Sequence, residues 1–180
     1  MTLAYTLNEN GIKLIDLNFD TSIAFASMNG AFISGTGDYV TVFEPSGLQL
    51  EKEGYGHVVA SLGKLGGEVP YTTFQAKKSY IKNNKDIIEK FTKAIQKGLD
   101  YTFNHTNKEV AEAIANYFPD TSLEDLTEVV KRYRENDSWY KTTFITEEGF
   151  NRVQDIMENS KKLEKRVDYK KLVNTEYSKK

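Results

Sequence analysis

Apolar residues recur every three to four positions through the second half of the chain, which is the spacing of one face of an α-helix. Asp86 to about Asn104 is the strongest example, with a stripe made of Ile87, Phe91, Ile95, Leu99 and Phe103. Thr106-Asn-Lys-Glu109 has the capping-box pattern and predicts the start of another helix, which Pro119 ends. Residues 120–122 and Thr146 are suited to cap two further helices.

The first 69 residues show a different alternation. After a predicted helix over residues 2–10, short apolar runs bounded by glycine or polar turns alternate with helical patterns. The runs at 14–19, 38–42 and 57–62 predict strands, and helices are predicted at 23–34 and 45–53. This alternation is typical of a parallel α/β sheet, so the sequence predicts an α/β fold that opens on a helix.

A glycine-rich break marks the best candidate domain boundary. Residues 63–69 contain three glycines and are followed by a β-rich run, Pro70 to Ala76, after which the composition shifts to charged helices. We therefore predict two units, residues 1–69 and 70–180.

Composition narrows the function classes. The net charge of −2 and the isoelectric point near 5.8 give no basic face for nucleic acid. The chain has no cysteine, which excludes disulfides and thiolate metal sites, and its two histidines lack ligand-spaced partners. We therefore expect no metal, no cofactor and no nucleic-acid partner. The start of the chain lacks a signal-peptide pattern, and no apolar run is long enough to span a membrane.

Several blocks of sequence closely resemble the substrate-binding proteins of ABC transporters of the thiamine-pyrimidine, nitrate, sulfonate and taurine group. The blocks are Gly35 to Pro45, Leu50 to Gly54, Val58 to Leu62, Gly67 to Tyr71, Ala76 to Tyr80, Phe118 to Thr121, Val129 to Tyr133, Asp137 to Trp139 and Lys171 to Asn174. The resemblance implies a periplasmic-binding-protein-like fold of type II, with two α/β lobes and the ligand in the cleft between them.

The resemblance also implies that this chain is the C-terminal portion of such a protein. Residues 1–69 would form most of the second lobe with its parallel sheet, and residues 70–180 would form a crossover strand and the C-terminal helices of the first lobe. By the same resemblance we expect a non-enzymatic solute carrier with an ABC permease as partner. Full-length members of the family lie outside the cytoplasm, and the sequence as printed predicts no location of its own. A truncated chain would leave the helix face from Ile87 to Leu99 uncovered, or cover it by self-association.

Glu44 is the leading candidate for a ligand contact. It follows the predicted strand at 38–42 and precedes Pro45, which suits the first turn of a helix. Ligands of open α/β sheets bind at the carboxyl ends of strands. A carboxylate there can accept N–H groups from an amine, amidine or aminopyrimidine. The alternative is that Glu44 only interacts with the helix start behind it.

The other candidate ligand-binding residues are Phe43, Thr21, Ser22 and Tyr71. Phe43, with Tyr39, could supply an aromatic wall or could be core. Thr21 and Ser22 could hold an anion at a helix start or could be plain N-caps. Tyr71 could face the cleft or pack in the hinge.

The ligand type and two competing functions stay open at this point. A carboxylate at position 44 favours a thiamine-type pyrimidine or an aminosulfonate over a bare anion. An enzyme resembling thiamine-pyrimidine synthases of the same fold is disfavoured, because those relatives carry a cysteine-rich motif that this chain lacks. The third reading is a remnant that binds nothing.

Overall fold

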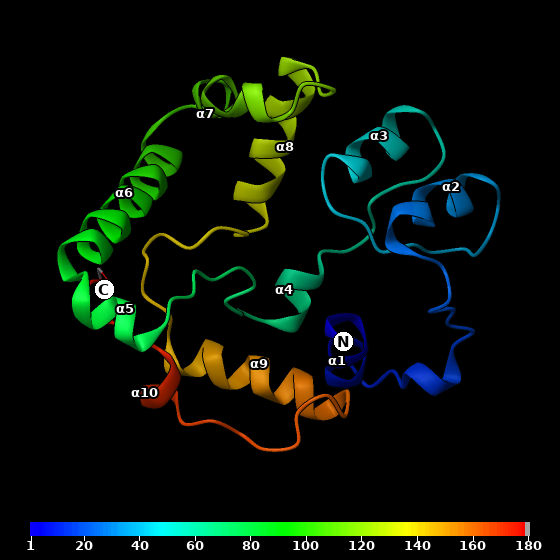
Figure 1. The fold of residues 1–180 in the computed structure, drawn as a ribbon. Coiled ribbons are helices and arrows are strands. Elements are labelled where there is room, and N and C mark those ends of the chain that lie inside the picture. The colour runs from blue at the N-terminus through cyan, green and yellow to red at the C-terminus, as the bar shows by residue number, and fades with distance from the viewer. Residues whose placement is uncertain (179–180) are drawn as a thin grey trace.

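The computed structural model describes residues 1–178, and none of these residues belongs to a β-strand. The helices are α1 (Thr2–Glu9), η1 (Leu14–Asp16), η2 (Phe25–Ser27), α2 (Met28–Ile33), α3 (Ser46–Lys52), α4 (Leu62–Gly66), α5 (Lys78–Asn83), α6 (Lys85–Asn104), α7 (Asn107–Ile114), η3 (Ala115–Tyr117), α8 (Leu123–Glu135), α9 (Glu147–Asn159) and α10 (Tyr169–Leu172). Figure 1 shows these helices spread out and joined by long connecting segments, with α1 beside α9 and α7 beside α8.

The predicted parallel sheet is therefore wrong. Residues 14–16 form a 3₁₀ turn, and the runs at 38–42, 57–60 and 70–76 have no regular structure. A strand exists only where a neighbour some 4.8 Å away takes up its N–H and C=O groups. Much of these runs instead faces water, as Ile15, Tyr39 and Val59 show with exposed fractions of 90%, 83% and 75%. Val40 and Val42 are half-buried.

The predictions of the main helices are confirmed, because their signals are local. The stripe at 86–104 forms α6, and residues 2–10 and 45–53 contain α1 and α3. The capping box is present: Thr106 Oγ1 accepts the Glu109 N–H at 3.2 Å, and Glu109 Oε2 accepts the Thr106 N–H at 2.8 Å. Ser122 and Thr146 cap α8 and α9 through their side-chain oxygens, which accept the Asp125 and Gly149 N–H groups.

The apolar core lies between α7 and α8. Its buried members are Val110, Ala111, Leu126 and Val130, and Ile114, Ala115 and Trp139 pack against them. Elsewhere the helices meet in small groups, α1 with α4 and α9, and α9 with α10. The core that positions α8 is thus compact and separate from the segment that carries Glu44.

A large surface surrounds this small core. The accessible surface is 13036 Å², whereas a compact monomer of the same mass would expose about 8,900 Å². The predicted uncovered face of α6 is confirmed at Ile87 and Phe91, which are exposed, while Ile95 and Leu99 are half-buried. The excess, about 4,000 Å², is larger than a standard protein–protein interface.

The predicted break at 63–69 contains a short helix in its first half. Ser61 caps α4, and Gly67 follows it with φ of 80°, a left-handed conformation that suits glycine. The Arg152 guanidinium of α9 lies against Gly67, and its Nη1 donates to the Glu68 carbonyl oxygen at 2.7 Å. The boundary at residue 69 stays a prediction. Over the described range, no helix has the length and apolar character needed to cross a membrane.

Candidate functional site

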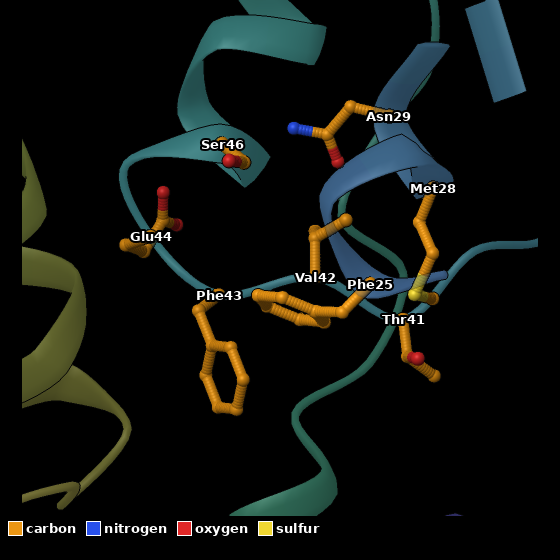
Figure 2. Close-up of a pocket in the computed structure, with 8 residues that line it drawn as sticks. All are labelled: Phe25, Met28, Asn29, Thr41, Val42, Phe43, Glu44 and Ser46. Atoms are coloured by element: carbon orange, nitrogen blue, oxygen red, sulfur yellow. The ribbon is translucent and has the colours of Figure 1, made fainter. Parts of the chain in front are cut away.

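A cavity of about 250 Å³ lies between α2 and the segment that leads into α3. Its lining residues are Phe25, Met28, Asn29, Thr41, Val42, Phe43, Glu44 and Ser46 (Figure 2). Two sequence-predicted site residues, Phe43 and Glu44, are therefore at one cavity. The cavity is small and mainly apolar, with Glu44 as the charged group among the described residues that line it.

Three aromatic side chains from distant parts of the chain gather beside this cavity. The ring centroids of Phe25 and Phe43 are 5.9 Å apart, and those of Phe43 and Tyr71 are 6.0 Å apart. Both pairs are tilted, within the usual range for interacting rings. All three rings are more than half exposed. Grouped exposed aromatics are typical of a surface that a ligand or partner covers.

Glu44 makes two contacts through its two carboxylate oxygens. Oε2 accepts the Leu48 N–H of α3 at 2.8 Å, and Oε1 accepts Nη1 of Arg132 from α8 at 3.1 Å. The interaction with the helix start, which the sequence offered as the alternative, is thus present. The ligand contact of Glu44 stays a prediction, and the structure adds Arg132 as an unexpected partner.

Arg132 lies at the centre of a group of carboxylates. Its Nη2 donates to Glu51 Oε2 at 2.5 Å, and its Nε lies 3.8 Å from Glu128 Oε1. Burial alone would lower the pKa of Arg132, but its hydrogen bonds to Glu51 and Glu44 raise that pKa overall. The pKa of Glu51 lies below its usual range. The largest cause is the hydrogen bond from the Val58 N–H, and Arg132 contributes less.

The remaining predicted site residues lie outside the cavity lining. Thr21 and Ser22 are exposed and cap no helix, because the next one, η2, has Ala24 as its N-cap. The Ser22 N–H instead donates to Asp20 Oδ1 at 2.7 Å. Tyr39 is exposed and is not among the residues that line the cavity. Tyr71 reaches the site only through its ring contact with Phe43.

Sequence reasoning missed Phe25, Asn29 and Arg132. Phe25 and Asn29 lie within the predicted helix at 23–34, but periodicity did not single them out as site residues. Arg132 belongs to the block Val129 to Tyr133 that carried the family resemblance, so a signal for it was present. No group of side chains suited to hold a metal ion occurs within residues 1–178.

The site combines a small, mainly apolar cavity, a group of exposed aromatic rings and one carboxylate, and the comparisons with known proteins agree with a binding role. The NMT1/THI5-like family matches residues 1–109, and the chain belongs to this family. Over 177 residues, 98% of the chain, it is 42% identical to the protein named "Putative binding protein YtlA" of Bacillus subtilis (strain 168). The chain spans 53% of that relative's length. No solved structure matches the chain significantly.

Proposed function

We propose that this chain supplies part of the ligand site of a solute-binding component of an ABC importer, and that the solute is a thiamine-type pyrimidine or another flat, amino-bearing ring. The observation that carries the proposal is the gathering of Phe25, Phe43 and Tyr71 beside the cavity that Glu44 lines. Aromatic faces hold a flat ring, and a carboxylate accepts the N–H groups at its edge.

The charges around the site favour an amino heterocycle over an aminosulfonate. Three carboxylates, those of Glu44, Glu51 and Glu128, lie against a single guanidinium. Lys131 also pairs with Glu128, at 3.2 Å. Three carboxylates therefore meet two cations, which leaves one negative charge, and a sulfonate group would meet repulsion there. The name of the relative supports a non-enzymatic binding role. The resemblance to substrate-binding proteins of ABC transporters supports an ABC permease as partner.

Isothermal titration calorimetry tests the proposal. The probes are benzamidine and the free aminopyrimidine of thiamine, with taurine and nitrate as anionic comparisons. Because the three rings are largely open to water, we expect weak affinity for the first two probes, with a Kd on the order of 1 mM. Equal heats for all four probes, or none for any, would contradict the proposed function.

Two substitutions test whether the probes bind at this cavity. Phe43→Ala removes the central ring and should weaken probe binding about tenfold, and Glu44→Gln should do the same by removing the charge. Phe74→Ala is the matched control, because Phe74 is also exposed but packs edge-on against Phe91 of α6. Equal losses in Phe43→Ala and Phe74→Ala would show that the heats come from elsewhere.

A further inference from the structure

The carboxylate proposed to meet the ligand is already occupied by a residue of the same chain. Arg132 stands 88 positions after Glu44, and the side chains of Glu44 and Arg132 are 12% and 22% exposed, respectively. Ion pairs that are shielded to this extent are stronger than exposed surface pairs. A ligand that needs Glu44 must therefore compete with Arg132.

The contact also sets the direction of the Glu44 side chain. Figure 2 shows the Glu44 carboxylate on the α3 side of the segment, near Ser46, whereas the Phe43 ring lies on the opposite side. Arg132 and the Leu48 N–H hold the carboxylate in this direction. A ring stacked on Phe43 could reach Glu44 with its edge only after the carboxylate turns away from Arg132.

We propose that Arg132 is a built-in competitor for the ligand, which occupies Glu44 in the empty site and is displaced when the ligand binds. This inference rests on the proposed function. Arg132 is then a specificity-determining residue, because a ligand that binds Glu44 must offer planar N–H donors in place of those of the guanidinium. Glu51 and Glu128 retain Arg132 after displacement, so the released guanidinium is not left unpaired.

The contact between Arg132 and Glu44 also indicates more closely which chemical class of ligand would fit. A guanidinium donates in-plane N–H groups to carboxylates, so the best replacement is a flat amidine or a ring with an amino group beside a protonated ring nitrogen. A primary ammonium group offers the charge without the planar donors. Benzamidine should therefore bind more tightly than benzylamine, which has the same phenyl ring.

Calorimetry with benzamidine tests the competition directly. Arg132→Gln removes the competitor and should bind benzamidine about fivefold more tightly than the unsubstituted chain. Arg132→Lys keeps the charge without the planar fork and should fall between the two. Arg152→Gln is the matched control, because Arg152 has a similar exposure of 24% and an ion pair with Glu148 away from the cavity. Unchanged or weaker binding by Arg132→Gln would show that Arg132 supports the site and does not compete.

A ligand-free measurement separates this inference from the proposed function. The chain has no cysteine, so spin labels can be placed at Gln49→Cys on α3 and Glu135→Cys on α8, both exposed positions. Lys52 of α3 and Asp125 of α8 form a second ion pair between these helices, so the labels are measured in a Lys52→Gln background. Without ligand, Arg132→Gln should broaden the distance distribution between the labels in that background. If no probe binds to any variant, the proposed function fails. A broadened distribution would then still support the Arg132 contact as the link between Glu44 and α8, and an unchanged one would overturn it.

Discussion

The link between α3 and α8 yields a prediction whose size follows from the contact distances. We take a double-mutant cycle of Glu51→Gln and Arg132→Gln, because Glu51 Oε2 and Arg132 Nη2 are 2.5 Å apart and both side chains are less than a quarter exposed. Opposite charges some 4 Å apart attract by about 4 kcal/mol near a protein surface. Desolvation and side-chain ordering cancel much of this, so we expect a coupling free energy of about 1.5 kcal/mol at neutral pH.

The same coupling should depend on pH in one direction. The folded-state pKa of Glu51 lies below its ordinary value of 4.5, chiefly because of the Val58 N–H and then Arg132. A carboxyl group with a lowered pKa stabilises the folded state above its unfolded pKa. That contribution is lost as the pH falls through the folded pKa, so the coupling should be complete above pH 4.5 and vanish in stronger acid.

Urea unfolding followed by far-ultraviolet circular dichroism measures the four free energies of the cycle. The matched control is the cycle of Glu89 and Lys93 on α6, an exposed pair with 2.6 Å between its charged atoms. That pair should show a coupling of about 0.5 kcal/mol or less. A Glu51–Arg132 coupling no larger than the control, or one that persists in strong acid, would refute the reasoning.

Three further predictions concern the core, the glycines and the surface. Leu126→Ala should lower the free energy of unfolding by about 2–5 kcal/mol because Leu126 is 1% exposed, whereas Leu172→Ala, at 66%, should change it by less than about 0.5 kcal/mol, and similar losses in urea titrations would contradict the assigned core. Gly98→Ala in α6, where an added Cβ meets nothing within 4 Å, should raise the free energy of unfolding by about 0.5–1 kcal/mol. Gly66→Ala should lower it, because the added Cβ would lie 2.6 Å from the buried Thr6 hydroxyl, and a Gly66→Ala variant that is more stable would show that α4 packs differently. The exposed apolar side chains, such as Ile87 and Phe91 on α6, should drive self-association of two copies, since the excess of total surface, about 4,000 Å², is larger than a standard interface. Phe91→Glu should weaken this association in size-exclusion chromatography, and a monomer that binds no hydrophobic dye would rule it out.

The helices could be predicted because their signals lie within a few residues of each other. The stripe of α6, with an apolar residue every four positions, and the capping box at Thr106 can be recognised without information from the rest of the chain. The sheet could not be judged in the same way, since a strand depends on a partner far away in sequence. Short apolar runs such as 57–60 satisfied the strand pattern and yet remained exposed. The helices α4 and α5, of five and six residues, were too short to show a period.

The site was predictable only in part for the same reason. Phe43 and Glu44 are neighbours in the chain, and their place just before a helix was visible in the sequence. The contacts of Phe25 and Tyr71 with Phe43 join segments that are far apart. Arg132 pairs with Glu44 across 88 positions. Its place in the block Val129 to Tyr133 marked it as part of the resemblance, but that block does not reveal its partner.

Arg132 reaches Glu44 because α8 packs against α7 on one side and directs Arg132 toward α3 on another. Leu126 and Val130 fix the helix to α7 by apolar burial, while Arg132, two residues further on, faces α3. The core therefore sets where the guanidinium lies, but only charge holds it to Glu44 and Glu51. Salt screens partly exposed charges more than it affects apolar contacts. Raising the ionic strength should loosen the α3–α8 link while the α7–α8 core stays folded, which makes the contact at Glu44 the more adjustable of the two.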